Sequence, residues 1–135
     1  MNILDSVVTQ AAAIAAIRRD IHAHPELCFE EVRTADVIAK QLADWGIPVH
    51  RGLGKTGVVG IVKNGGSSRA VGLRADMDAL PIQEFNTFSH ASKNPGRMHA
   101  CGHDGHVAML LAAAQHFAKN RNFDGTVYLL SLIHI

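Results

Sequence analysis

The feature that most constrains the fold is a change in the spacing of apolar residues along the chain. Residues 7–21 and 35–45 carry apolar side chains every three or four positions, which is the spacing of amphipathic helices. Short β-branched runs follow at 57–62 and 70–75, then a third helical pattern at 107–117 and an apolar run at 126–130. Helices that alternate with apolar strands predict an α/β sandwich with a mixed sheet.

Turn residues between these segments refine the prediction. Pro25 ends the first helix, because the residue before a proline avoids helical backbone angles. The second helix is expected over about 30–45, and Gly46 is typical of a helix end. Residues 64–68 are rich in Gly and Ser and predict a hairpin between the two β-branched runs. Residues 76–104 show no clear period, and a loop of that length is usually functional.

Composition limits the classes of function. With 135 residues the chain is long enough for one domain with a core. Its formal charge of +1 argues against a nucleic-acid or membrane-surface partner, because such partners require a concentrated basic patch. No apolar run is long enough to span a bilayer, and the first ten residues carry no basic region typical of a secretory signal. With two cysteines the chain has too few for a disulfide scaffold, so we expect a cytoplasmic protein.

A glycine-rich segment at 52–57 matches the GxGxxG pattern of dinucleotide-binding proteins. In that motif a helix follows directly and presents its N-terminus to the pyrophosphate. A β-branched strand pattern follows here instead. We therefore interpret the segment as a glycine-rich turn that enters a strand.

The segment around Cys101 concentrates metal-binding side chains. Within a few positions it holds His99, Cys101, His103, Asp104 and His106, and thiols and imidazoles are good ligands for divalent transition metals. Alternate residues of an extended segment face the same side, so the thiol and the imidazole two positions later can converge on one ion. The carboxylate is expected to cap the following helix. Chemistry alone does not choose among the three histidines.

Two other polar clusters are candidates for a site. Asp76 and Asp78 directly follow a predicted buried strand, so they are either metal ligands or acceptors that orient a ligating imidazole, with a capped turn as the alternative. His22 and His24 lie at the predicted end of the first helix. We expect a structural role for these two histidines, since a cationic side chain there complements the helix dipole.

Three motifs, at residues 18–27, 73–84 and 98–106, occur in this order. Together they resemble the amidohydrolase branch of the M20 metallopeptidase family, which includes hippurate hydrolase and the hydrolases of N-acyl and indole-acetyl amino acids. The resemblance implies a zinc-exopeptidase-like catalytic domain, a three-layer sandwich. Residues 1–130 would form the N-terminal part of that domain, which would therefore be incomplete.

The same resemblance implies a metal-dependent amidohydrolase that cleaves the amide bond of small N-acyl amino acids with metal-activated water. Two divalent ions would serve a complete site, chosen from manganese, zinc, nickel and cobalt. Cys101 and His103 match two metal ligands of the family, and Asp78 matches a position that supports a ligand. Full-length members of the family are expected to be homo-oligomers.

The chain departs from the family pattern at residues 131–135. Family members continue there into Gln-Pro-Ala-Glu-Glu, whose first glutamate is the general base and whose second is a metal ligand. Here the chain reads Ser131-Leu132-Ile133-His134-Ile135, so the general-base glutamate is absent and the native origin of this segment is in question. Cys28 also replaces a common family glycine. We expect the polypeptide alone to be inactive and poorly soluble. A non-catalytic metal-binding module and a dead truncation product are the alternatives.

Overall fold

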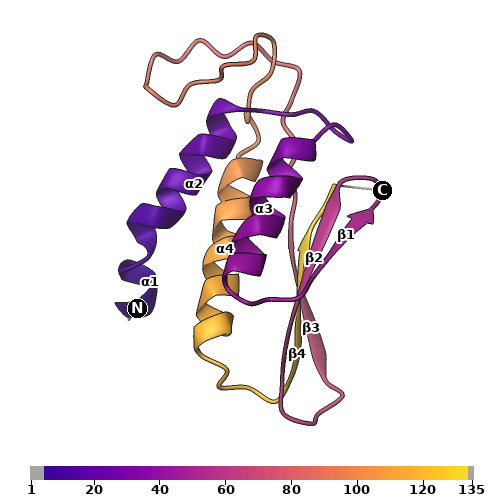
Figure 1. Ribbon diagram of the computed structural model, residues 1–135. Coiled ribbons are helices and arrows are strands. Elements are labelled where there is room, and N and C mark those ends of the chain that lie inside the picture. The colour runs from indigo at the N-terminus through magenta and orange to yellow at the C-terminus, as the bar shows by residue number, and fades with distance from the viewer. Residues whose placement is uncertain (1–4, 134–135) are drawn as a thin grey trace.

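The computed structural model describes residues 5–133. Its helices and strands alternate along the chain, and Figure 1 shows the helices gathered on one side of a sheet. The helices are α1 (Asp5–Val8), α2 (Ala11–Ala23), α3 (Val32–Asp44) and α4 (His103–Lys119), and the strands are β1 (Val49–Leu53), β2 (Gly57–Asn64), β3 (Ala70–Ala75) and β4 (Gly125–Ser131).

The four strands form a mixed sheet in the order β1-β2-β4-β3. β2 is antiparallel to both β1 and β4, whereas β3 is parallel to β4. The predicted α/β class and the mixed sheet are therefore confirmed. Of the three layers expected, the described residues form the sheet and the helices on one of its sides (Figure 1). None of the described helices has the length and apolar character needed to cross a bilayer.

The predicted hairpin between β2 and β3 is wrong, because β4 lies between these two strands. The amide nitrogen Nδ2 of Asn64 donates to the carbonyl oxygens of Arg121 and Phe123, at 2.9 and 2.7 Å. The turn residue that suggested a hairpin thus holds the connection that leads into β4. β4 is central because its backbone pairs with β2 on one side and with β3 on the other.

The hairpin of this sheet joins β1 to β2, and β1 was not predicted from the sequence. β1 is an edge strand with mostly exposed side chains and a register shift between Arg51 and Leu53, so it shows no alternation of apolar residues. The turn that follows it contains the glycine-rich segment, as expected. Lys55 in this turn adopts a positive φ of 81°.

Helix α3 begins at Val32, two residues later than the sequence suggested. Its first turn is capped by a carboxylate from another segment of the chain. Glu26 accepts hydrogen bonds from the backbone nitrogens of Arg33 and Thr34, at 3.0 and 2.7 Å. A carboxylate at this position satisfies amide groups that have no partner within the helix and complements the helix dipole.

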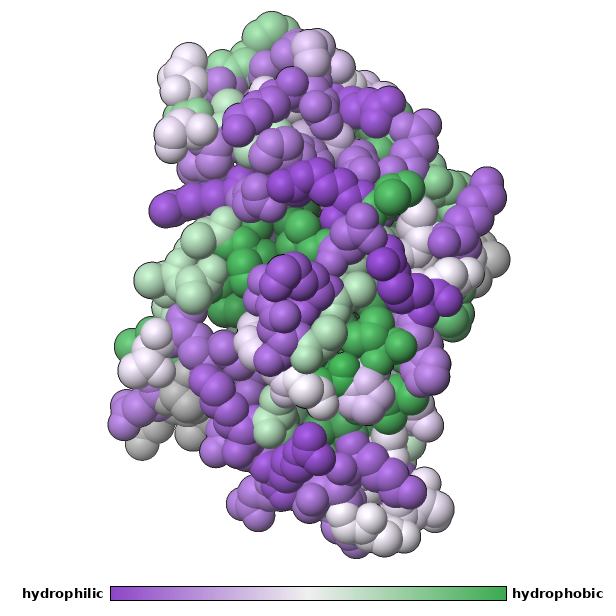
Figure 2. Space-filling view, in the orientation of Figure 1, coloured by the Kyte–Doolittle hydropathy of each residue, from purple (hydrophilic) through white to green (hydrophobic). Residues whose placement is uncertain are grey.

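The core lies between the sheet and the two helices α3 and α4, while α2 packs against α4. Figure 2 shows that apolar residues also reach the surface near the middle of the molecule, between more hydrophilic ends. The core includes Ile133, which is 3% exposed and lies in the segment that departs from the family pattern. Ser131 in the same segment is the last residue of β4 and pairs with β2 and β3. Residues 134–135 lie outside the described residues. The largest fully buried apolar side chains are Ile21, Ile38, Leu42, Met77, Leu111 and Leu129.

The orientation of α4 can be tested with two substitutions. Leu111 is fully buried, so Leu111→Ala should lower the free energy of unfolding by about 2–5 kcal/mol. Met109 is 64% exposed on the same helix, and Met109→Ala should change it by less than about 0.5 kcal/mol. Urea denaturation followed by circular dichroism measures both effects. Equal losses for the two variants would contradict the packing of α4 described here.

Candidate metal centre

The segment that leads into α4 is a turn, and its geometry corrects two expectations. Gly102 is the N-cap of α4 and has a left-handed φ of 79°, a conformation that glycine adopts without a steric penalty. Cys101 lies in the turn before it, so the thiol and His103 do not belong to one extended segment. Asp104 is not the helix cap. It lies in the first turn of α4 and is 1% exposed.

Three side chains from two elements converge beside this turn. Asp76, His103 and His106 each present one possible ligand atom, and these atoms all lie within 4.8 Å of one another. Asp76 follows the end of β3. The two imidazoles are three residues apart on α4, and their ring centroids are 5.2 Å apart. A carboxylate and two imidazoles form a donor set that suits zinc, manganese and related divalent ions.

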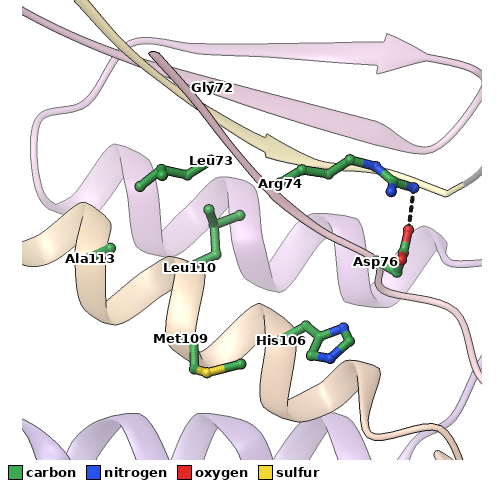
Figure 3. Close-up of a pocket in the computed structure, with 8 residues that line it drawn as sticks. All are labelled: Gly72, Leu73, Arg74, Asp76, His106, Met109, Leu110 and Ala113. Atoms are coloured by element: carbon green, nitrogen blue, oxygen red, sulfur yellow. Dashed lines mark hydrogen bonds and ion pairs between the residues drawn. The ribbon is translucent and has the colours of Figure 1, made fainter.

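A cavity of about 480 Å³ lies between β3 and α4 next to this set. Figure 3 shows Asp76 and His106 at one end of the cavity, with Asp76 also paired to Arg74. The aliphatic side chains of Leu73 and Leu110 line it farther along (Figure 3).

The metal set overlaps only partly with the residues expected from the sequence. His103 is a member, whereas Cys101, an exposed free thiol, lies outside the set found among the described residues. For Asp76, the role of metal ligand was one of those that the sequence left open. His106 was one of three histidines that chemistry alone did not separate. The signal that could have found them is the pairing of a strand end with the first turn of the next helix, because these two places meet in α/β folds.

Asp78 contacts one of the ligand candidates directly. Its carboxylate oxygen Oδ1 and its backbone oxygen each lie 2.9 Å from Nδ1 of His103. Nδ1 of His103 donates its proton to these oxygens, which leaves Nε2 as the nitrogen available to an ion. A carboxylate behind an imidazole is the arrangement that typically orients histidine ligands in metal sites.

A buried ionic network stands behind the set, on the side of α2. Oδ2 of Asp104 lies 3.1 Å from Nε of Arg18 and 3.0 Å from Nδ1 of His22. The other ring nitrogen of His22 lies 3.2 Å from Oε1 of Glu84. His22 lies in the last turn of α2, as expected, and its ring also contacts carboxylates outside that helix. His24 is the C-cap of α2, and its Nδ1 contacts the carbonyl oxygen of Asp20 in the same helix at 2.8 Å.

The two carboxylates of this network are ionised at neutral pH. Burial raises the pKa of Asp104, but the net shift is downward, because His22 and Arg18 form hydrogen bonds with the carboxylate and Arg18 is positively charged. Burial likewise raises the pKa of Glu84. Hydrogen bonds from Asn86, Ser92 and His22 have the opposite and larger effect, so the pKa of Glu84 is lowered overall. Asp104 therefore forms an ion pair with Arg18.

His99 does not belong to the metal set among the described residues. Its side chain is buried, with 4% of the residue exposed, and neither ring nitrogen has a protein partner. Burial lowers the pKa of His99 to about 4, so the ring is neutral at pH 7.

A second buried carboxylate lies at the start of α3. Glu31 is fully buried and accepts a hydrogen bond from Oγ1 of Thr56 at 2.9 Å, while its other oxygen has no partner. Burial raises the pKa of Glu31, and the negative charge of Asp78 adds to that shift. The ionised form of Glu31 is thus disfavoured in the folded chain.

This shift predicts how stability depends on pH. Because the folded-state pKa is raised, the contribution of Glu31 is fully present below the unfolded-state pKa and is lost as the pH rises through the folded-state pKa. We expect Glu31→Gln to leave the melting temperature nearly unchanged near pH 4 and to raise it at pH 7. Thermal unfolding at both pH values measures the difference.

Glu30→Gln is the matched control, because Glu30 is exposed and pairs with Arg97 at the surface. Glu30→Gln should change the free energy of unfolding by less than about 1 kcal/mol at either pH. A Glu31→Gln variant that is less stable than the parent chain at pH 7 would contradict a disfavoured charge at this position.

The chain is similar to known proteins of one peptidase family. A model of the peptidase family M20/M25/M40 matches residues 72–132, which include most of β3 and all of α4 and β4. The chain is 46% identical to the hippurate hydrolase of Campylobacter jejuni over 129 residues, which is 96% of this chain and 33% of that relative. It is 49% identical to the N-acyl-L-amino acid amidohydrolase of Geobacillus stearothermophilus over 120 residues, which is 89% of this chain and 32% of that relative.

A solved structure shares the fold. The YXEP protein of Bacillus subtilis, described as a dinuclear metal-binding peptidase from the M20 family, superposes with a TM-score of 0.87 at 38% identity. The match covers 92% of this chain and 35% of that protein. The chain therefore spans about a third of the length of the relatives it matches.

Proposed function

We propose that this chain, which matches a model of the peptidase family M20/M25/M40 over residues 72–132, contributes to a metal-dependent amidohydrolase that cleaves N-acyl amino acids. The observation that carries the proposal is the convergence of Asp76, His103 and His106, with Asp78 behind His103. Metal binding is proposed for this chain. Amide hydrolysis is proposed for a protein that also carries the remaining segments of its relatives.

The donor set fits a divalent ion by its chemistry. A carboxylate and two imidazoles accept manganese, zinc, nickel or cobalt, and the thiol of Cys101 is a further donor in the adjacent turn. We infer two such ions in a complete site, which the description of the Bacillus subtilis structure as dinuclear supports. When bound, the ions would supply Lewis acidity, which lowers the pKa of a water molecule and polarises a carbonyl group.

The chain's own residues prepare this chemistry. Asp78 holds the proton at Nδ1 of His103, and therefore Nε2 keeps its lone pair for coordination. Gly102 allows the chain to turn sharply, so that the first turn of α4 faces the end of β3. The glutamate that the family resemblance assigns as the proton acceptor has no counterpart at residues 131–135. Proton transfer to the leaving amine is therefore outside what these residues supply.

We infer that the substrate is a small N-acyl amino acid of the hippurate type, because the relatives are named for such compounds. A closed structural zinc site is the competing function, and it requires four protein ligands. Asp76, His103 and His106 are the set of three that the described residues bring together, which favours an ion with open positions.

Metal binding by the chain can be tested with ligand variants. His103→Ala should weaken zinc or cobalt binding by more than about 100-fold, because the outer partners of a ligand alone contribute 10–100-fold. His106→Ala should also weaken it. His50 is exposed on β1, so His50→Ala is the control and should leave affinity unchanged. Isothermal titration calorimetry measures all three. Binding that is unaffected by His103→Ala would refute this site.

The role of Asp78 predicts a smaller loss. In Asp78→Ala the imidazole of His103 loses the carboxylate that orients it, although the backbone oxygen of residue 78 remains. Metal affinity should fall by about 10–100-fold without a change in the number of ions bound. The visible spectrum of the cobalt-loaded chain also reports whether the site is open or a closed tetrahedron. A closed tetrahedral spectrum would favour the structural-zinc alternative.

Amide hydrolysis can be tested in a chimera with the Campylobacter jejuni relative, because 96% of this chain aligns with it. Residues 5–130 would replace the corresponding segment of that hippurate hydrolase. The chimera should release glycine from hippurate, and the same chimera with His103→Ala should not. A folded, metal-loaded chimera without activity would count against the proposed function.

A further inference from the structure

His22 occupies an unusual position between two buried carboxylates. Its side chain is 12% exposed, while those of Asp104 and Glu84 are 1% and 2% exposed. It stands in the last turn of α2, Asp104 in the first turn of α4, and Glu84 in the long loop after β3. The imidazole is thus the point at which three separate parts of the chain meet.

Each ring nitrogen of His22 contacts one of the two carboxylates. Nδ1 lies 3.0 Å from Oδ2 of Asp104, and Nε2 lies 3.2 Å from Oε1 of Glu84. An ionised carboxylate only accepts hydrogen bonds, so each ring nitrogen must donate one. A neutral imidazole carries one N–H and satisfies only one of these contacts. Both contacts are satisfied at once when the ring is an imidazolium.

We propose that His22 is a positioning residue of the metal centre: as an imidazolium held between Asp104 and Glu84, it fixes the first turn of α4 and hence the direction of His103 and His106. The inference rests on the proposed function only in treating His103 and His106 as metal ligands. The clamp, by which we mean the contacts of His22 with Asp104 and Glu84, is present in the chain without a bound metal ion.

Asp104 is well placed to transmit this effect. It lies between the two ligand candidates His103 and His106 on the same helical turn, and its carboxylate points to α2 instead of to the metal set. No side chain caps the start of α4, where the N-cap is Gly102. The bonds to Asp104 therefore tie the first turn of the helix to α2, while the bond of His103 to Asp78 ties it to the segment after β3.

The other contacts of the network do not replace His22. Arg18 also bonds to Asp104, but its side chain is 55% exposed, and its ion pair is with Asp104 and not with Glu84. Glu84 is itself held by Nδ2 of Asn86 at 2.9 Å and by the backbone nitrogen of Ser92. His22 is thus the buried link between a fixed carboxylate in the loop and the carboxylate on α4.

Three aromatic rings lie near His22, and its side chain is largely buried. The ring centroids of Phe88, His90 and His99 lie 5.7, 5.6 and 6.2 Å from that of His22. In such surroundings ion pairs are less screened than at the surface. The charge on His22 should therefore hold both carboxylates firmly.

The first test observes the protonation state in the metal-free chain. Nitrogen-15 NMR of the histidine rings distinguishes an imidazolium from either neutral tautomer. At neutral pH both nitrogens of His22 should carry protons. In Glu84→Gln, which keeps the shape of the side chain but removes its charge, the imidazolium should be less stable. A neutral ring at His22 in the parent chain at pH 7 would overturn the proposal.

The second test measures the effect on the metal set. In His22→Gln one carboxylate would face an amide oxygen, so the first turn of α4 should loosen and zinc affinity should fall by at least about tenfold. His24→Gln is the matched control, because His24 contacts only Asp20 of its own helix among the bonds of its ring. Zinc affinity of this control should equal that of the parent chain.

Amide hydrogen exchange of residues 105–107 gives a readout that needs no metal. Exchange should be faster in His22→Gln than in the parent chain and unchanged in His24→Gln. Equal exchange and equal zinc affinity in the two variants would overturn the proposal. If His22→Gln does not fold, Glu84→Gln takes its place, and parent-like affinity and exchange in that variant would overturn the proposal as well.

The two proposals can fail separately. A parent chain that binds no metal would refute the proposed function, while the NMR and exchange measurements would still decide whether His22 clamps α4. A chain that binds metal equally well with and without His22 would refute the clamp and leave the proposed function standing.

Discussion

The parallel pairing of β3 with β4 is the constraint on which the site depends. The chain leaves β3, passes through the long loop, returns along α4 and enters β4 beside the strand it left. This crossover places the first turn of α4 at the end of β3 where the chain leaves the strand. Asp76 and Asp78 therefore lie close to His103 in space, although the long loop separates them from it along the chain. Open α/β sheets form their sites at this end of the strands for the same reason.

The site is accompanied by several buried acidic side chains. Asp104, Glu84 and Glu31 are each less than a tenth exposed. The first two are stabilised as carboxylates by cationic and hydrogen-bonding neighbours, whereas burial disfavours the charge on Glu31. Buried ions contribute little to stability on balance but strongly penalise the loss of a partner. The network is therefore better understood as a device that orients α4 than as a source of stability.

The sequence was sufficient for the fold class, for the three long helices and for the strands with β-branched runs. It was insufficient for β1, whose exposed edge position leaves no apolar alternation, and for the order of the strands, because the turn chemistry at Asn64 serves a different connection. His103 and Asp78 were singled out from their motifs. The partners of His22 were not predictable from spacing, since they lie 62 and 82 residues away along the chain.

The most direct measurement of the central claim is X-ray absorption spectroscopy of the zinc-loaded chain. The arrangement of Asp76, His103 and His106 predicts scattering from two imidazole rings together with oxygen donors. Replacement of His103 by alanine should reduce the imidazole scattering or abolish binding. A spectrum without imidazole scattering, or one that is identical in this variant, would contradict a metal centre between β3 and α4.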